Sequence, residues 1–293
     1  MKTMRARIGI TIYSVDYTMR PDDLAREVEA RGFESLWVPE HSNIPTSRKT
    51  PWPGSLTGEP LPREYSHMLD AFVALSMAAA VTKNLRLGTG VMLPAQRDAI
   101  WTSKQISSLD FLSNGRVEVG VGVGWNQDEI ESHGANFRER WDKTREVAEA
   151  MRVMWRNEVA EYNGDLVHVP PTWQWPKPVQ PGGPKIHLGG GTGPRLLGEV
   201  AKWADGWMPI SARPSLAGRL KMLEEACDKV SRDWRTLDIS VFGANTTVDG
   251  LCNLFEEGIT RAILTLPPEG PDVILPLLDE WAATKDAVYA RMN

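Results

Sequence analysis

Cysteine is scarce in this sequence, and its two copies form no recognisable site. Cys227 and Cys252 both fall in predicted helices, and neither belongs to a CxxC pair or to a Cys/His metal spacing. We therefore expect two small, buried, apolar side chains rather than a metal site, in a protein of a reducing compartment.

Long apolar runs and concentrated charge are also missing. The longest apolar run, Ala71 to Val81 with one serine, is far shorter than the roughly 20 residues of a membrane-spanning helix. The net charge is −5, with no block of like charges and no Lys/Arg stripe of the kind that binds nucleic acid. We expect a cytoplasmic protein that acts on a small organic molecule, with no nucleic acid and no membrane as partner.

The common motifs of metal sites, ester hydrolysis and dinucleotide binding are absent as well. The histidines include no HxH, HxxxH or HExxH pair, so no metal site is predicted, although separated residues could still assemble one. There is no GxSxG and no Cys/His nucleophile pattern. Gly120, Gly122 and Gly124 are followed by Trp125 where a Rossmann GxGxxG fingerprint needs glycine, which argues against a nicotinamide-binding domain.

The sequence does contain a regular alternation of short apolar runs and helical segments. Eight runs suit strands buried on both faces: residues 7–13, 35–38, 85–93, 116–123, 185–188, 204–209, 237–242 and 259–266. Helical segments follow them at 21–31, 67–82, 98–112, 142–155, from 194, and at 214–232, 248–257 and 271–291. Eight such units predict an α/β fold, a (β/α)8 TIM barrel forming one domain over residues 1–293, with its active site at the C-terminal ends of the strands.

Two polar insertions interrupt this alternation, after the second and fourth predicted strands. Ser42 to Ser66 contains five prolines, and a loop of that length is uncommon in a compact domain unless it binds or covers something. Residues 126–141 form the other insertion, and a surface excursion at 156–184 contains a predicted hairpin around Asn163-Gly164. We expect the proline-rich loop to form part of the substrate entrance.

The third and fourth predicted strands contain several glycines. Gly88 and Gly90 interrupt the third strand, and Gly120, Gly122 and Gly124 leave one face of the fourth without side chains. A flat ligand could lie against that bare face, or the glycines could serve only to fit neighbouring barrel strands. The strand by itself is compatible with both interpretations.

A second glycine run lies between the fifth strand and its helix. Gly189 to Gly193 precede Pro194, which opens the helix that carries Arg195. Flexible backbone beside the positive end of a helix dipole suits an anion such as phosphate. Glycine-rich turns also occur without a ligand, and barrel phosphate sites usually follow later strands, so both interpretations stay open.

Glu40 and His41 follow the second strand, where a structural turn requires neither. A lone histidine is usually a capped or surface residue, but at a barrel mouth a neighbouring acid can set its tautomer and prepare it to move a proton. Trp52, Trp101 and Trp125 fall in or near the same mouth and could wall an aromatic ligand, although most of the 12 tryptophans should be core.

Five ordered stretches resemble the luciferase-like monooxygenase superfamily, and within it the F420-dependent oxidoreductases most closely: SLWVPEHSNIP, SRKTPWPG, LPREYSHMLDAFVALSMAAAVTKNLRLGTGVMLPAQRD, LDFLSNGRVEVGVGVGWN and KIHLGGGTGPRLLGEVAKWADGW. The resemblance implies a barrel that holds coenzyme F420, a deazaflavin, or alternatively FMN, at its C-terminal mouth. It assigns to the cofactor Glu40, His41, Thr89, Gly90, Val91, Gly122, Val123, Gly124, Trp125, Gly189, Gly190, Gly191 and Arg195.

The resemblance also implies roles within that set. Gly90-Val91 is expected to form a cis peptide or a β-bulge behind the middle ring of the cofactor, and Gly189 to Gly191 to take its phosphate. Glu40 and His41 match the acid-histidine pair of F420-dependent sugar-phosphate dehydrogenases, so they are the expected catalytic residues, with Glu40 orienting His41. Those enzymes have a catalytic glutamate where this chain has Trp125, which counts against sugar-phosphate oxidation and leaves the substrate open.

Taken together, these features predict hydride transfer between F420 and a small organic substrate, with His41 managing a proton. One alternative is an FMN-dependent monooxygenase that uses reduced FMN and oxygen, and another is a non-catalytic flavin-binding barrel. The intact Glu40-His41 pair and the long loop favour an enzyme. The resemblance further implies a homodimer.

Overall fold

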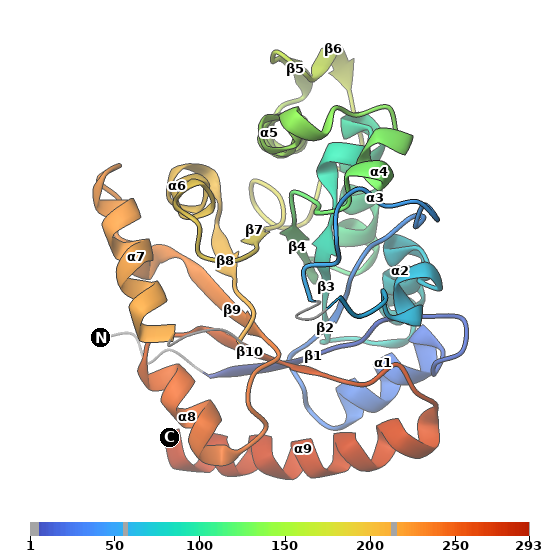
Figure 1. Ribbon diagram of the computed structural model, residues 1–293, viewed down its shortest axis with the longest axis vertical. Helices are drawn as coiled ribbons and strands as arrows, with labels where there is room; N and C mark the ends of the chain where they lie inside the picture. Colours follow the sequence, from blue (N-terminus) through green and yellow to red (C-terminus); the bar gives the residue numbers. More distant parts are fainter. Residues whose placement is uncertain (1–5, 55–57, 212–215, 293) are drawn as a thin grey trace.

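A closed barrel of eight parallel strands forms the centre of the molecule, as a computed structural model that describes residues 6–54, 58–211 and 216–292 shows (Figure 1). The strands are β1 (Arg7–Thr11), β2 (Ser35–Val38), β3 (Arg86–Met92), β4 (Val117–Val121), β7 (Ile186–Gly189), β8 (Gly206–Met208), β9 (Asp238–Phe242) and β10 (Arg261–Thr265). They follow one another around the barrel in chain order, and β10 closes on β1. The predicted TIM barrel is therefore confirmed.

One helix follows each barrel strand and packs outside it (Figure 1). These are α1 (Pro21–Ala30), α2 (Ala71–Val81), α3 (Ala99–Leu112), α5 (Arg140–Arg156), α6 (Pro194–Trp203), α7 (Leu216–Asp228), α8 (Val248–Glu256) and α9 (Pro271–Met292). In α1, for example, Leu24, Ala25 and Val28 are buried at helical spacing, while Asp22 and Asp23 lie in the first turn, where acids favour the helix dipole. Cys227 in α7 and Cys252 in α8 are both buried, as predicted.

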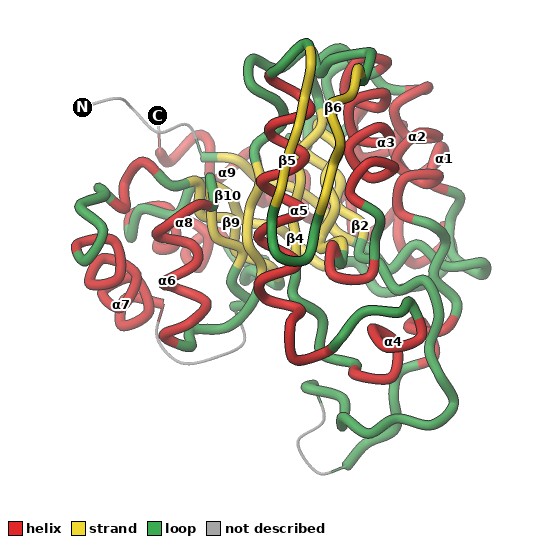
Figure 2. Tube along the Cα trace, turned by 90° about the horizontal axis from the view of Figure 1, so that it is seen from above, coloured by secondary structure: helices red, strands yellow, loops and turns green. Residues whose placement is uncertain are grey.

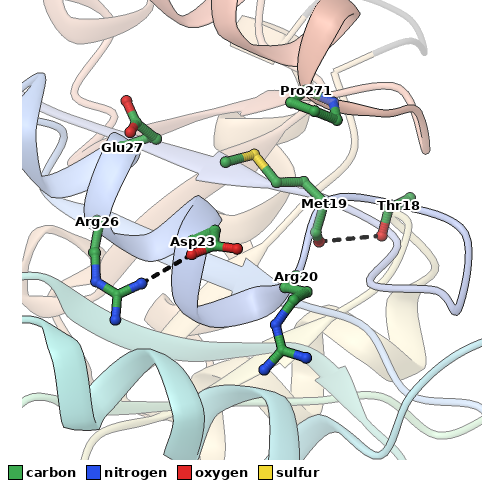
Figure 3. A pocket seen from close by; sticks show the side chains of 7 residues that line it. All are labelled: Thr18, Met19, Arg20, Asp23, Arg26, Glu27 and Pro271. Carbon is green, nitrogen blue, oxygen red and sulfur yellow. Dashed lines mark hydrogen bonds and ion pairs between the residues drawn. The ribbon is translucent and has the colours of Figure 1, made fainter.

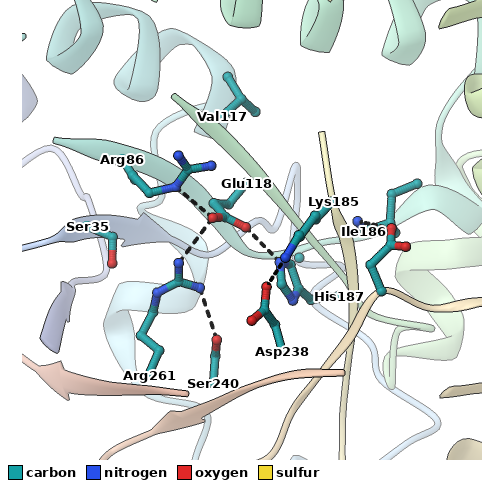
Figure 4. Close-up of polar contacts among 12 residues, drawn as sticks. Ser35, Arg86, Val117, Glu118, Lys185, Ile186, His187, Asp238, Ser240 and Arg261 are labelled. Carbon is teal, nitrogen blue, oxygen red and sulfur yellow. Dashed lines mark hydrogen bonds and ion pairs between the residues drawn. The ribbon is translucent and has the colours of Figure 1, made fainter. Parts of the chain in front are cut away.

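The barrel interior is filled by two layers of side chains with different chemistry. Near the N-terminal ends of the strands, Glu118 accepts hydrogen bonds from Arg86 at 2.7 Å and Arg261 at 3.1 Å, and pairs with His187 at 2.7 Å (Figure 4). We call these four residues the polar layer. Burial raises the pKa of Glu118, but the hydrogen bond with His187 and the charges of Arg261 and Arg86 together hold that pKa well below its usual value of 4.5.

An apolar layer lies above the polar layer, toward the C-terminal ends of the strands. Trp37, Met208 and Ile263 pack together there, fully or almost fully buried, with Val91 and Phe242 against them. The Arg261 guanidinium lies 5.1 Å from the centre of the Trp37 ring, so the two layers are in direct contact. The barrel axis is consequently a packed core, and a ligand has room only beyond the strand ends.

Insertions follow the second and fourth barrel strands, as predicted. The first runs from residue 39 to residue 70 and contains the 3₁₀ turn η1 (Arg63–Ser66). The second contains the short helix α4 (Gln127–Ser132) and the 3₁₀ turn η3 (Phe137–Glu139). Between α5 and β7 the predicted hairpin is present as β5 (Val159–Asn163) and β6 (His168–Trp173), which lie beside α5 (Figure 2). Two further 3₁₀ turns are η2 (Pro94–Gln96) and η4 (Trp234–Thr236).

Two features of the helices differ from the predicted ones. The second helix begins at Ala71 rather than at residue 67, because the Asp70 side chain accepts the Val73 amide at 2.9 Å and caps the helix there. The segment 126–141 was predicted as a polar insertion without a helix, and α4 forms within it. The predicted start of the seventh helix at Pro214 lies outside the described residues. Among the described residues, no helix has both the length and the apolar character that crossing a membrane requires.

Candidate active site

The candidate site lies at the C-terminal mouth of the barrel, where the two insertions meet the ends of β2, β3 and β4. Glu40 and His41 come directly after β2, and Gln96 belongs to the 3₁₀ turn that follows β3. Trp125 follows β4, and Glu129 lies in α4 one helical turn later. Residues that are far apart in the sequence are therefore neighbours at this mouth.

His41 is held by a carboxylate that the sequence does not place beside it. Its Nδ1 lies 2.7 Å from Oε2 of Glu129, whose side chain is only 1% exposed. The other carboxylate oxygen of Glu129 accepts a hydrogen bond of 3.1 Å from Nε2 of Gln96. Glu129 is thus fixed on both sides, and neither Glu129 nor Gln96 was predicted as a site residue.

Glu40 has a different partner from the one predicted. Its carboxylate accepts the Leu93 amide at 2.7 Å and Nε of Arg97 at 2.8 Å, and it also contacts Nη2 of Arg97. It therefore ties the end of β2 to the segment after β3. The prediction that Glu40 orients His41 is wrong, because adjacent residues at the end of a strand point in different directions.

Aromatic rings surround His41 on its other side. The ring centre of Tyr65, from η1, lies 5.2 Å from the His41 ring, and that of Trp125 lies 6.0 Å away. The Tyr65 hydroxyl accepts Nε1–H of Trp52 at 3.0 Å and lies 3.2 Å from the hydroxyl of Tyr13. Burial, and then the neighbouring Tyr65, raise the pKa of Tyr13, which therefore stays a hydrogen-bond donor. Trp52 and Trp125 are at the mouth, as predicted, whereas Trp101 is exposed on α3.

The proline-rich loop and α4 are joined by polar contacts. The Lys49 amide donates to Asp128 at 2.6 Å, and its Nζ lies 3.0 Å from Glu131. Ser42 Oγ lies 2.6 Å from Nε2 of His133, at the end of the same helix. The two insertions therefore form one cap beside the mouth, which Figure 2 shows as the loop running past α4.

Strand β3 is irregular where the sequence predicted it. The peptide bond between Gly90 and Val91 is cis, and the pairing of β3 with β4 shifts register between Thr89 and Met92. The prediction for this dipeptide is confirmed. Thr89 itself is buried, and its hydroxyl bonds the amide and the carbonyl of Gly120, at 3.0 and 2.8 Å. The Thr89 side chain therefore joins β3 to β4 instead of lining an open site.

The bare face of β4 is filled by protein atoms. A Cβ added at Gly120 would lie 2.2 Å from the Thr89 carbonyl oxygen, and one at Gly122 would lie 2.6 Å from the Val91 side chain. A Cβ at Gly124 would meet Ile130 at 2.7 Å. Of the two interpretations left open by the sequence, these contacts favour glycines that fit their neighbours.

The glycine run after β7 is different, because part of it faces open space. A Cβ at Gly191 or Gly193 would meet no atom within 4 Å. The run leads into α6, whose first residue is Pro194. Nη2 of Arg195 lies 3.4 Å from Asp142, and its guanidinium lies 5.0 Å from the Trp141 ring. Exposed backbone amides, a helix N-terminus and a nearby cation together suit an anionic group.

Two of the cavities among the described residues lie outside the strand ends. One of about 300 Å³ lies beside His41 and is lined by Glu40, His41, Ser42, Met68, Leu69, Asp70, Gln96, Arg97 and His133. The other, of about 420 Å³, lies between the starts of α1 and α9 (Figure 3). Its Arg20 and Arg26 form ion pairs with Asp22 and Asp23. No group of three or more metal-binding side chains occurs in the described parts of the chain.

Comparisons with known proteins agree with this arrangement. Residues 17–249 match the profile of the luciferase-like monooxygenase family. The uncharacterized protein Rv0953c of Mycobacterium tuberculosis is 36% identical over 277 residues, which cover 94% of this chain and 97% of that protein. The F420-dependent glucose-6-phosphate dehydrogenase of Amycolatopsis mediterranei is 26% identical over 238 residues, 78% of this chain and 64% of that one.

Two solved structures share the fold along nearly the whole chain. An F420-dependent secondary alcohol dehydrogenase in complex with an F420-acetone adduct superposes with a TM-score of 0.75 at 17% identity, covering 97% of this chain and 99% of that one. The monooxygenase RslO1 from Streptomyces bottropensis gives a TM-score of 0.73 at 18% identity, covering 97% and 98%. With its matched profile and its barrel, the chain belongs to the luciferase-like monooxygenase family of flavin- and F420-dependent oxidoreductases.

Proposed function

We propose that this protein is an F420-dependent oxidoreductase that transfers a hydride to or from a small organic substrate. The observation that carries the proposal is His41, a largely buried histidine at the barrel mouth with one ring nitrogen fixed by Glu129. The other ring nitrogen has no hydrogen-bond partner among the described residues. A histidine held in this way is suited to exchange a proton with a substrate hydroxyl or carbonyl. The relative that is described as an F420-dependent glucose-6-phosphate dehydrogenase supports the choice of cofactor.

The residues present fit such a cofactor at its anionic end. Gly191 and Gly193 leave open space beside the N-terminus of α6, which is the cradle that a phosphate group needs. Gly191, Gly193 and Arg195 would hold that group, because a Cβ at Gly189 or Gly190 would meet Val91 or Leu196. The backbone of Gly90 to Val91 and of Gly122 to Trp125 would lie near the ring. When bound, F420 supplies a carbon centre that passes hydride but reacts poorly with oxygen.

The protein's own groups have separate tasks in this proposal. His41 gives or takes the proton that accompanies the substrate's change of oxidation state. Trp125 and Tyr65 present aromatic faces beside it and exclude water from the reacting groups. Glu40 binds Arg97 and the Leu93 amide, and so keeps the turn that carries His41 in place. Trp125 offers no carboxylate, so this proposal does not include sugar-phosphate oxidation.

The cofactor is tested by titrating the purified protein with F420 and with FMN, following fluorescence and absorbance. We expect F420 to bind more tightly by about tenfold or more, a difference of roughly 1.4 kcal/mol. Turnover of candidate alcohols or ketones with F420 should proceed equally well without oxygen. Tighter binding of FMN together with an oxygen-dependent product would instead identify a monooxygenase. Binding of either cofactor without any turnover of the tested substrates would favour a non-catalytic barrel.

We also propose that the protein is a homodimer. The support comes from exposed apolar side chains on α2 and α3: Val73 is 59% exposed, Trp101 70% and Leu112 79%. The two helices pack against each other, and apolar side chains exposed on neighbouring helices can be covered by a second subunit. Light scattering at micromolar concentration should give twice the chain mass of 32.6 kDa, and Trp101→Glu should lower it toward one chain. A monomeric mass for the wild-type protein would refute the dimer.

A further inference from the structure

We infer that Glu129 is the positioning residue that fixes the proton of His41 on Nδ1 and leaves Nε2 to exchange a proton with the substrate. The inference rests on the proposed function for the identity of that substrate, but its structural part concerns His41 in the free protein. The acid-histidine pair of this site is then formed by Glu129 and His41, and the neighbouring Glu40 is not part of it.

The geometry of the pair supports this assignment. The distance of 2.7 Å between Oε2 of Glu129 and Nδ1 of His41 is that of a strong hydrogen bond. Both side chains are buried, with 1% of Glu129 and 9% of His41 exposed, so water competes little for either group. Gln96 donates from Nε2 to the second carboxylate oxygen, which stops the carboxylate from turning away.

Glu40 cannot take this role while its present contacts hold. Both of its carboxylate oxygens are occupied by Arg97, and one also accepts the Leu93 amide. Its negative charge is thereby balanced by the guanidinium of Arg97. The uncompensated carboxylate facing His41 is that of Glu129, because Gln96 donates a hydrogen bond but carries no charge.

The position of the hydrogen follows from what each atom can do. An ionised carboxylate only accepts hydrogen bonds, so Nδ1 must donate. In the neutral ring Nε2 then carries the lone pair, and no described residue donates to it. Nε2 is therefore available to accept a proton from a substrate hydroxyl, or to return one in the reverse reaction. The negative charge of Glu129 stabilises the imidazolium that forms.

Several other charged or titratable groups lie around His41 and must be considered. They are Tyr65 across its ring and, around the adjoining cavity, Glu40, Asp70, Arg97 and His133. Arg97 is bonded to Glu40 and lies 3.8 Å from Asp70, so these charges offset one another. His133 is bonded to Ser42 and Asn43. Of these groups and Glu129, only Glu129 bonds His41.

The first test measures the His41 ring in the free protein by ¹⁵N NMR, which requires neither cofactor nor substrate. We expect the neutral wild-type ring to be protonated at Nδ1, and Glu129→Gln to convert part or all of it to the Nε2-protonated form, because the new amide can donate to Nδ1. Glu139→Gln, which changes an exposed carboxylate in the turn η3 that follows α4, should leave the His41 signals unaltered. An unchanged tautomer in Glu129→Gln would overturn the inference.

The second test compares pH profiles of turnover with the F420-loaded enzyme. We expect Glu129→Gln to lower kcat by roughly 10²-fold while the Kd for F420 changes less than threefold, and to move the acidic limb of the profile to lower pH because the imidazolium loses its counter-charge. Glu129→Asp keeps the charge and should retain the position of that limb, at reduced rate. If Glu129→Gln keeps both kcat and the limb, the assignment is wrong.

These two tests separate the inference from the proposed function. If F420 does not bind but the NMR tautomer depends on Glu129 as expected, the pairing holds and the cofactor proposal fails. If F420 supports turnover but neither the tautomer nor the pH profile depends on Glu129, the function holds and the pairing is rejected.

Discussion

Oε2 of Glu129 and Nδ1 of His41 lie 2.7 Å apart although 88 residues separate them in the sequence. Their strands, β4 and β2, are not neighbours in the barrel, because β3 lies between them. The contact is made above β3 by the insertions that leave β2 and β4. The geometry at His41 therefore depends on both insertions being folded onto each other.

His41→Ala should separate catalysis from cofactor binding. Removing the imidazole is expected to lower kcat by roughly 10²-fold or more, the usual contribution of a general acid or base, while the Kd for F420 changes much less. Steady-state rates and a fluorescence titration on the same preparation measure both quantities. Near-normal turnover would reduce His41 to a cofactor contact or a structural cap.

Gly191→Ala should weaken cofactor binding without weakening the fold. A Cβ at this position meets no protein atom within 4 Å, so the melting temperature should be unchanged, but the methyl group would occupy space needed by a phosphate. We expect the Kd for F420 to rise about tenfold, or roughly 1.4 kcal/mol. Gly198→Ala, in the following helix and equally free of contacts, is the matched control. Equal affinity in both variants would place the phosphate elsewhere.

Tyr65→Phe tests whether the proline-rich loop shapes the substrate entrance. The substitution removes a hydroxyl bonded to Trp52 and Tyr13 but keeps the ring beside His41. With each hydrogen bond contributing about 1 kcal/mol, we expect KM to rise roughly tenfold with little change in kcat. Tyr162→Phe removes a hydroxyl bonded to Glu149, away from the mouth, and should leave KM as it is. An unchanged KM in Tyr65→Phe would show that the hydrogen bonds of the Tyr65 hydroxyl play no part in substrate binding.

Glu118→Gln should destabilise the barrel and alter its response to acid. Replacing one member of a buried ionic network costs about 3 to 5 kcal/mol, which urea unfolding at pH 7 measures. The pKa of Glu118 is held well below 4.5 in the folded protein, so its contribution to stability is present above about pH 4.5 and is lost as the pH falls through the folded value.

The dependence of stability on pH tests the role of the Glu118 carboxylate separately from the total loss of stability. Between about pH 5 and pH 3, the stability of Glu118→Gln should fall less steeply than that of the wild-type protein, since this carboxylate no longer takes up a proton on unfolding. The control variant Glu256→Gln, which changes an exposed carboxylate in α8, should show the same dependence of stability on pH as the wild-type protein. Parallel acid curves for Glu118→Gln and the wild-type protein would contradict the role assigned to the polar layer.

The sequence was most informative where local pattern and tertiary structure agree. Continuous apolar runs such as residues 35–38 are the property of strands covered on both faces, and each was found in the barrel. The exact start of α2 was missed because one side chain, Asp70, decides it. A cap of this kind competes with the helical tendency of the residues before it, and that balance is not visible in periodicity.

The sequence predicted where the candidate site lies, but it did not predict which side chains form hydrogen bonds with each other there. His41, Trp125 and the glycine run were identified because they follow predicted strands, where barrel sites form. Glu129 was missed although it is an acid four residues after Trp125, because the segment around it was interpreted as a loop. The pairing of Glu40 with Arg97 could not be inferred either, since it depends on the direction in which each side chain leaves the strand end.

The buried side chains of Trp37, Met208 and Ile263 fill the barrel interior, so a ligand can reach the strand ends only through the C-terminal mouth. Buried side chains block the axis below them as well, so nothing can enter or leave through the N-terminal end. The ligand that lies deepest in the mouth must therefore bind first and dissociate last. A cofactor seated against the strand ends would therefore bind before the substrate and leave after the product in each turnover, because it is spent once its hydride has been transferred, and the kinetics should show compulsory order, with cofactor before substrate.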